Sequence, residues 1–287
     1  MPAPPHRRSP TIRRRRLSRE LRRLREESGL TAEEVWRRLE WSAGKLSRIE
    51  QNDWRRPNPR DVKDLLDLYG VTDEARRQAL ITLARESRER GWWETEFGDV
   101  LGGDYAGFEA EADRIYSYEP LVIPGLLQTA AYARAVIRGD MIRDPEEVER
   151  RVALRMKRQA ILTAPNPPML WAIVDEAALH RPFGTREDRI EQLERLIATN
   201  DSDHITVQVI PFSVGMHPGL ACGFALLDYA HPDESSIVYV EMGGHALYLE
   251  KAEDLKSHSL RFQHLQAAAL DKDATTEFLR RLLADLK

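Results

Sequence analysis

The fold of the N-terminal part is decided by one stretch, residues 21–50, which reads LRRLREESGL TAEEVWRRLE WSAGKLSRIE. Within it, Thr31 precedes Glu34 by three positions, and this spacing predicts a capping box at the start of a helix. In a capping box the two side chains satisfy backbone amides that the first helical turn leaves without partners. Val35 and Leu39 follow four residues apart, so we expect both on the inner face of a helix that starts just after Thr31 and ends near Leu39.

A second helix can begin only three residues later, after the turn Glu40-Trp41-Ser42, with Ser42 as its cap. Its pattern predicts that Leu46 and Ile49 are buried. The residues that this helix would expose are Lys45, Ser47 and Arg48. Two short helices joined by so tight a turn are typical of a helix-turn-helix, whose second helix enters the major groove of DNA by its N-terminal residues.

Helical patterning also extends towards the N-terminus from this motif. A first helix is expected from Leu17, because Leu21 and Leu24 are spaced for one face and Gly29 is a suitable C-terminal stop. Residues 1–16, which precede it, are rich in Pro and Arg and too polar to fold alone. We therefore expect them to form a disordered basic arm.

Charge is distributed unevenly along the chain. Residues 1–60 contain 17 Lys and Arg residues against eight Asp and Glu, a net charge of +9, whereas the whole chain carries −4. The remaining residues therefore carry −13. A basic end on an acidic body indicates nucleic-acid binding, because Lys and Arg that neutralise phosphates release condensed counterions. A solvated basic tail without a partner is the alternative. We expect double-stranded DNA as the partner.

Two segments, 21–31 and 46–50, resemble the Xre/Cro-like helix-turn-helix of phage repressors, and the resemblance covers about residues 17–71. It implies two further helices, at about 59–69 and 73–90. Together with the basic charge, the resemblance favours a sequence-specific DNA-binding transcriptional regulator over a helical hairpin that merely packs.

The candidate DNA-binding residues fall into two groups. Those that the resemblance implies to face base edges are Ala43, Gly44, Ser47 and Arg48. The others are Thr31, which would cap its helix near a phosphate, the helix cap Ser42, and the backbone-positioning residues Lys45, Arg55, Arg56 and Asn58. Arg48 is the best reader of sequence, because its planar fork can form two hydrogen bonds with guanine, whereas Ala43 can only touch a thymine methyl.

The resemblance also implies an ion pair between Arg25 and Glu50 that locks the first helix to the third. Three positions depart from the family pattern. Ala32 stands in place of a common Gln, Trp36 in place of a small residue, and Glu40 in place of the usual turn glycine, although that turn favours a positive φ. These departures affect the crossing angle of the two helices and therefore which residues reach the bases.

Beyond residue 90 the pattern changes to a mixed α+β body. The predicted organisation is a basic arm at 1–16, a helix-turn-helix domain at 17–90 and an α+β domain at 91–287. Helices are expected at 108–118, 126–138, 145–162, 186–199, 254–270 and 274–286. Strands are expected at 169–174, 205–209, 223–229, 237–241 and 246–249.

The body resembles a second family, over most of residues 92–283. It is the Scr1-type antitoxin-like domain that follows Xre-type modules in regulators of high-GC Gram-positive bacteria. The segments that carry the resemblance are Val122–Thr129, Tyr132–Arg134, Arg158–Gln159, Asp175–Leu179 and Val238–Glu241. The resemblance implies a small partner protein encoded next to this one. The alternative is a body that senses a small ligand or retains an enzymatic activity.

No residue pattern in the body points to catalysis. His217 and Cys222 lie five apart, but a turn histidine and a small buried cysteine are much commoner than a nucleophile and its base. The eight histidines show no His-Glu-x-x-His spacing, so neither a metal nor a cofactor is expected. Pro124–Thr129 and Gly243-Gly244 are interpreted as structural turns. We therefore expect a protein that is not an enzyme.

Composition indicates the cellular compartment and the oligomeric state in which this regulator would work. Cys222 is the single cysteine, and neither a secretory signal nor a membrane-spanning run occurs, so we expect a cytoplasmic protein. A single module of this size reads few base pairs, which favours a homodimer. Candidate interface residues are Phe278, Leu279, Leu282, Leu283 and Leu286, with core packing as the alternative. A pocket lined by polar groups would favour a ligand, and an exposed apolar groove a protein partner.

Overall fold

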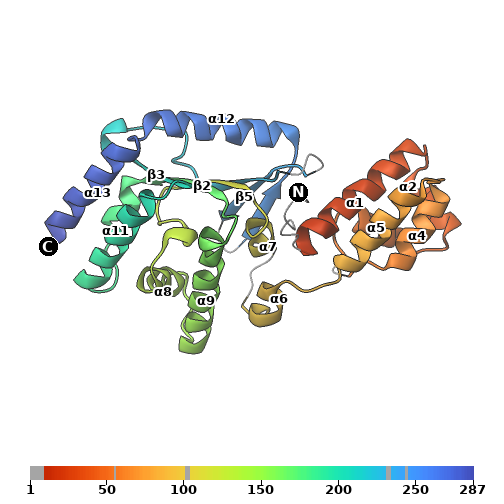
Figure 1. The fold of residues 1–287 in the computed structure, drawn as a ribbon, viewed down its shortest axis with the longest axis horizontal. Coiled ribbons are helices and arrows are strands. Elements are labelled where there is room, and N and C mark those ends of the chain that lie inside the picture. The colour runs from red at the N-terminus through yellow and green to blue at the C-terminus, as the bar shows by residue number, and fades with distance from the viewer. Residues whose placement is uncertain (1–9, 55, 101–103, 231–233, 243–244) are drawn as a thin grey trace. The chain divides into compact units, whose positions relative to one another are not determined.

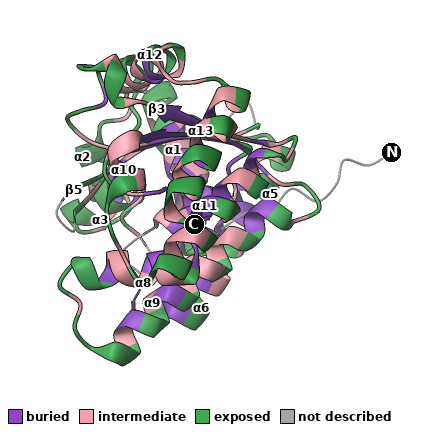
Figure 2. Ribbon diagram, turned by 90° about the vertical axis from the view of Figure 1, so that its left-hand side faces the viewer, coloured by how far each residue is buried: buried purple, intermediate pink, exposed green. Residues whose placement is uncertain are grey.

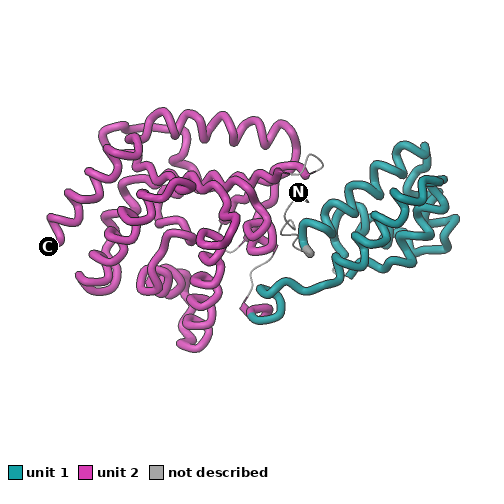
Figure 3. The backbone as a smooth tube through the Cα atoms, in the orientation of Figure 1, with its two compact units in different colours: residues 1–96 teal, residues 97–287 magenta. Residues whose placement is uncertain are grey.

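The chain divides into two compact units, residues 1–96 and 97–287 (Figure 3). The computed structural model describes residues 10–54, 56–100, 104–230, 234–242 and 245–287. The division falls a little after the predicted junction at 90/91.

Unit 1 is helical, as predicted. Its helices are α1 (Pro10–Glu27), α2 (Ala32–Arg38), α3 (Ala43–Glu50), α4 (Pro59–Leu68) and α5 (Glu74–Glu86), and the short α6 (Trp92–Phe97) lies at the boundary (Figure 1). The core contains fully buried leucines from three helices, namely Leu17 and Leu21 of α1, Leu46 of α3, and Leu65 and Leu66 of α4. Burial of these side chains, about 1.5–3 kcal/mol each, is the main force that assembles the helices.

The prediction of a disordered arm is wrong for residues 10–16, which form the first turns of α1. Part of the charge of this basic run is balanced by residues distant in sequence. Arg13 lies 3.4 Å from the carboxylate of Glu86 and 3.3 Å from that of Glu89. Such contacts cannot be inferred from local polarity. Residues 1–9 of the predicted arm lie outside the described part of the chain.

Unit 2 is an α+β domain, which confirms the predicted fold class. Its six strands are β1 (Arg114–Glu119), β2 (Met169–Asp175), β3 (Ile205–Ile210), β4 (Phe224–Asp228), β5 (Ile237–Met242) and β6 (His245–Leu249). They form one sheet in the order β3-β2-β1-β4-β5-β6. The pairs β1–β2 and β2–β3 are parallel, whereas β1–β4, β4–β5 and β5–β6 are antiparallel.

Helices cover both faces of this sheet. They are α7 (Tyr105–Glu109), α8 (Ala130–Gly139), α9 (Pro145–Arg158), α10 (Glu176–His180), α11 (Arg186–Asn200), α12 (Ala252–Ala268) and α13 (Lys272–Leu286). The described residues of the unit also form the short 3-10 turns η1 (Gly125–Leu127), η2 (Gln159–Thr163) and η3 (Phe212–Val214). Helix α12 lies over one face, and α8, α9 and α11 lie on the other (Figure 1). The buried strands therefore form the middle layer (Figure 2).

The prediction of a helix over residues 108–118 is wrong. Helix α7 ends at Glu109 and strand β1 begins at Arg114. The strand lies in the middle of the sheet, where Arg114 is in register with Met169 of β2 and with Asp228 of β4. Pairing on both sides by distant segments overrides the local helical pattern. Helix α8 also begins later than predicted, because Thr129 is its N-cap and accepts the amide of Tyr132 at 3.2 Å.

The turn between α2 and α3 contains a residue in the left-handed conformation, which confirms the expected positive φ. Glu40 has a φ of 54° and its side chain is exposed. This conformation costs a residue with a Cβ about 1–2 kcal/mol, and glycine adopts it without that strain. A glycine would therefore fit this backbone better than Glu40 does.

We predict that Glu40→Gly raises the free energy of unfolding of unit 1 by about 0.5–1 kcal/mol, the strain relieved less the extra chain entropy of glycine. Hydrogen exchange of the α2 and α3 amides in the full chain measures this gain locally. The control is Gln51→Gly, at a position where φ is −91° and glycine relieves no strain. Equal or lower protection in Glu40→Gly than in the parent would contradict the prediction.

Candidate nucleic-acid interface

The start of α2 is fixed by the predicted capping box, which the structure confirms. The Thr31 hydroxyl oxygen accepts the Glu34 amide at 3.2 Å, and the Glu34 carboxylate accepts the Thr31 amide at 2.8 Å. The Thr31 hydroxyl also donates to that carboxylate at 2.8 Å. Hydrogen bonds from the Thr31 amide and hydroxyl lower the pKa of Glu34. Both hydrogen-bond donors of Thr31 are thus used inside the box.

Helix α3 has the inner and outer faces that its sequence predicts. Leu46 is fully buried and Ile49 is 2% exposed. The exposed residues of the same helix and its cap are Ser42, Ala43, Gly44, Ser47 and Arg48. Ser42 occupies the N-cap position with extended backbone, but its hydroxyl makes no capping hydrogen bond within the described structure. Its role at the helix start is therefore conformational.

Arg48 lies along the exposed face of α3, towards the helix N-terminus. A Cβ atom placed on Gly44 would lie 3.2 Å from Nη1 of Arg48, which shows that the guanidinium extends over the first turn. The N-terminal part of a recognition helix is the part that approaches base edges. Gly44 is therefore useful here because it leaves room for the Arg48 side chain.

The predicted backbone-positioning residues have different environments. Lys45 is half-buried, because its ammonium lies 2.9 Å from the carboxylate of Asp61 and 3.8 Å from the ring centroid of Trp41. The side chain of Asn58 caps α4 by accepting the Arg60 amide at 3.0 Å. Arg56 is exposed, and Arg55 lies outside the described residues. The cation–π contact of Trp41 with Lys45 follows a spacing of four residues, so the sequence held a signal for it.

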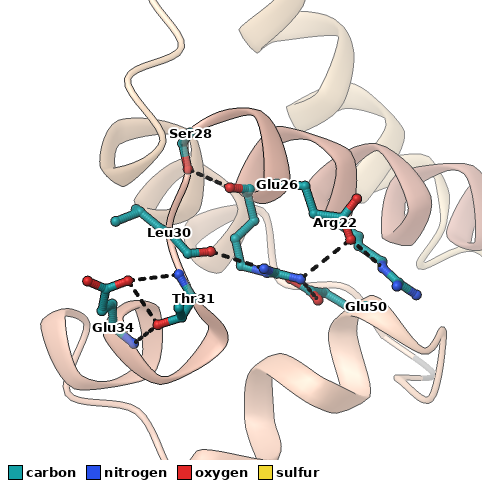
Figure 4. A network of polar contacts seen from close by, with 8 residues as sticks. Arg22, Glu26, Ser28, Leu30, Thr31, Glu34 and Glu50 are labelled. Carbon is teal, nitrogen blue, oxygen red and sulfur yellow. Dashed lines mark hydrogen bonds and ion pairs between the residues drawn. The ribbon is translucent and has the colours of Figure 1, made fainter.

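The ion pair implied for Arg25 and Glu50 is present and bidentate. Arg25 Nε and Nη2 donate to the two carboxylate oxygens of Glu50 at 2.6 and 2.9 Å. Nη1 of the same guanidinium donates to the Leu30 carbonyl at 3.0 Å, so α1, the loop before α2 and α3 meet at one group (Figure 4). The side chains are 14% and 10% exposed. The hydrogen bonds to Glu50 raise the pKa of Arg25.

Unit 2 holds a second candidate site, a cavity of about 720 Å³ on the face of the sheet away from α12. Its walls come from α7, α8 and α9, the turn at 122–128, and strands β1, β4 and β5. The charged residues of its lining are Glu109, Glu119, Asp140, Arg151, Arg155, Arg158, Arg181 and Glu241. The turn serves the expected structural role as well, since the buried Gln128 side chain donates to the Ile123 carbonyl at 2.6 Å.

His217 and Cys222 are not joined by a hydrogen bond in the described part of the chain. His217 Nε2 lies 3.1 Å from a carboxylate oxygen of Asp175, and Nδ1 accepts the Gly219 amide at 3.3 Å. Both ring nitrogens are therefore engaged, and this assignment puts the proton on Nε2. Among the described residues, no cluster of three or more His, Cys, Asp or Glu side chains could hold a metal ion.

Comparison with known families agrees with this division. Residues 16–80 match a helix-turn-helix domain, so unit 1 carries the DNA-binding domain of a regulator. Residues 103–281 match a domain of unknown function, DUF5753. Because this match covers more than half of the chain, the protein belongs to the DUF5753 family. No curated protein and no solved structure matches the chain. None of the described helices is long and apolar enough to cross a membrane.

We predict a strong energetic coupling between Arg25 and Glu50. Arg25→Met and Glu50→Leu should each destabilise unit 1 by about 3 kcal/mol, because each leaves one charge of a mostly buried pair uncompensated. The double variant should lose much less than the sum of the two. Urea-dependent hydrogen exchange of the unit 1 amides gives the three values.

The control is the pair Glu33 and Arg37 of α2, whose side chains are 59% and 67% exposed at an N–O distance of 2.5 Å. Exposed pairs are worth about 0–1 kcal/mol, so Glu33→Leu and Arg37→Met should be nearly additive. Additive effects at Arg25 and Glu50 would show that their contact contributes no coupling.

Proposed function

We propose that this protein is a sequence-specific transcriptional regulator that reads the major groove with α3 and acts in the cytoplasm, where its DNA lies. The observation that carries the proposal is the division of α3 into two faces. Leu46 and Ile49 anchor the helix in the core, while Ala43, Gly44, Ser47 and Arg48 remain exposed. A helix anchored in this way presents its side chains to base edges with little freedom to tilt.

Unit 2 is proposed as the domain that receives a signal. Its cavity has the size of a small-molecule site, for which volumes of about 300–1,000 Å³ are usual, and polar groups converge inside it. These properties favour a small ligand. The Scr1-type resemblance supports the other candidate, a small protein encoded next to this one. A stable complex of the two proteins in gel filtration, retained after mutation of the cavity, would support that candidate.

We also propose that the protein is not an enzyme. The support is the environment of His217, the only candidate base near a thiol in the sequence. Its two ring nitrogens are occupied by Asp175 and the Gly219 amide, so it offers no lone pair to Cys222. A thiol without an adjacent base is a weak nucleophile.

We predict that Arg48→Ala relaxes base preference at one position of each half-site by about 1–3 kcal/mol, because a bidentate Arg to guanine is a discriminating contact. Arg56→Ala should weaken all sequences alike and reduce the slope of log affinity against log salt by about 0.9. Binding selections with randomised duplexes, followed by salt titrations, separate the two effects.

The control for both variants is Arg138→Ala, which removes an exposed charge from α8 of unit 2. It should leave both the base preference and the salt slope nearly unchanged. If Arg48→Ala kept the parental preference profile, α3 would not be the reading helix.

The protein is further proposed to bind DNA as a homodimer, because competing genomic sites would outnumber the short sequence that one module reads. The suggested interface on α13 is only partly available. Leu279 is fully buried, because α13 packs against α11 and β3. Phe278, Leu282, Leu283 and Leu286 of α13 are half-buried. Core packing therefore accounts for at least the central leucine of this helix.

We predict that two recognition helices are spaced about 34 Å apart, one turn of duplex, or a multiple of it. Inserting about five base pairs between the selected half-sites should abolish tight binding, and about ten should restore it in part, since half a turn puts the sites on opposite faces. Sedimentation velocity at micromolar concentration measures the stoichiometry. Monomer alone, both free and on operator DNA, would exclude the dimer.

A further inference from the structure

The strands of unit 2 place acidic side chains on the cavity face of the sheet. Successive side chains of a strand point to opposite faces. On β1, Ile115, Ser117 and Glu119 line the cavity, whereas Tyr118 is in the core on the other face. On β5, Glu241 lines the cavity two residues after Tyr239. Both carboxylates are thus held by rigid elements.

Gly223, which directly precedes β4, leaves the space that the Glu119 carboxylate occupies. A Cβ atom on Gly223 would lie 2.7 Å from Oε2 of Glu119 and 3.0 Å from the Tyr118 carbonyl oxygen. Any side chain at position 223 would therefore displace the carboxylate. The register of β1 with β4, in which Tyr118 is opposite Phe224, puts Gly223 beside Glu119. The cavity is open at this point because glycine occupies it.

The charged residues of the cavity differ in their partners. Glu109 is neutralised by Arg158, whose Nε and Nη2 donate to its two oxygens at 2.7 and 2.8 Å. Arg155 donates to the Gln128 side-chain oxygen at 2.9 Å, and the Tyr239 hydroxyl donates to Glu241 at 3.0 Å.

Glu119 receives neither a hydrogen bond nor an ion pair from any described residue. The lining as a whole carries four carboxylates and four guanidinium groups, the latter being Arg151, Arg155, Arg158 and Arg181. Arg151 is paired with Glu147 at 2.8 Å. Asp140, Arg181 and Glu241 are exposed. Of the two carboxylates that are not exposed, Glu109 is neutralised by Arg158, and Glu119 is left without a partner among the described residues.

The ionisation of Glu119 reflects its burial without a partner. Burial, together with the negative charge of Glu241, raises the pKa of Glu119 to about 8, although Arg155 acts in the opposite direction. In the empty cavity the carboxyl group is therefore mostly protonated at neutral pH. A cation placed beside it would favour the ionised form, and the proton would leave to solvent.

We propose that the cavity binds a small organic cation, an ammonium with an apolar body, and that Glu119 is its counter-ion. The apolar body fits walls that include Ile123, Leu126 and Phe183. Tyr105 and Tyr239, whose ring centroids are 4.1 Å apart, form an aromatic wall that already attracts one cation, since the Arg158 guanidinium lies 5.0 Å from the Tyr105 ring centroid. This inference rests on the proposed role of unit 2 as a receiver of a small-molecule signal, and it specifies the chemical class of that signal.

The test uses benzyltrimethylammonium, which carries its charge at every pH, and benzyl alcohol as the neutral probe of similar body. Isothermal titration of the full chain at millimolar probe should show binding of the cation to the parent. Glu119→Gln should weaken it at least tenfold. Benzyl alcohol should bind the parent and this variant equally weakly. The control Glu191→Gln removes an exposed carboxylate of α11 and should leave cation binding unchanged.

The pH dependence supplies a readout that a merely structural residue would not give. Because the cation binds the ionised carboxylate, its affinity should rise roughly tenfold per pH unit below 8 and level off above it, with release of a proton. Glu119→Gln should remove this dependence. Gly223→Ala, which displaces the carboxylate without altering its charge, should also weaken binding.

Three results would overturn the proposal: no binding of the cation, equal binding of benzyl alcohol and the cation, or equal cation binding by the parent and Glu119→Gln. DNA binding measured in the same samples separates this inference from the proposed function. Loss of cation binding with intact DNA recognition would remove only the ligand assignment. Cation binding that leaves DNA affinity unchanged would retain the site and remove the signalling role of unit 2.

Discussion

The ion pair between Arg25 and Glu50 sets the orientation of the helix proposed to read DNA. Burial of leucines such as Leu21 and Leu46 drives α1 and α3 together, but that force has no direction. The planar fork of Arg25 adds direction, since it bonds both oxygens of Glu50 and the Leu30 carbonyl at once. Base readout tolerates little error in position. The directed contact therefore fixes an orientation of α3 that the apolar core alone would leave variable.

Unit 2 applies a comparable constraint through the two-residue period of its strands. On β1, Tyr118 belongs to the core and its neighbour Glu119 belongs to the cavity. A shift of register by one residue would exchange them, and would bury a carboxylate in the apolar layer beneath α12. The same packing that stabilises the sheet therefore also fixes where the cavity carries its charge.

Features that depend on neighbours in sequence could be predicted, and features that depend on distant partners could not. The capping box of Thr31 and Glu34 and the positive φ at Glu40 are local, and both were expected. The helical start at residues 10–16 was missed because Arg13 is balanced by Glu86 and Glu89. Strand β1 was missed because its partners lie far along the chain. The cavity could not be predicted because its lining comes from many segments, spread over residues 100–241.

The position of β1 has a consequence for the order in which the two units fold. Arg114 needs Asp228 opposite it, so the middle of the sheet stays incomplete until that residue has left the ribosome. Unit 1, by contrast, draws its core from the first 96 residues. Helical units with local contacts also fold faster than sheets closed over long loops. Each newly made chain therefore passes through an interval in which the DNA-reading unit is folded before the domain that would control it.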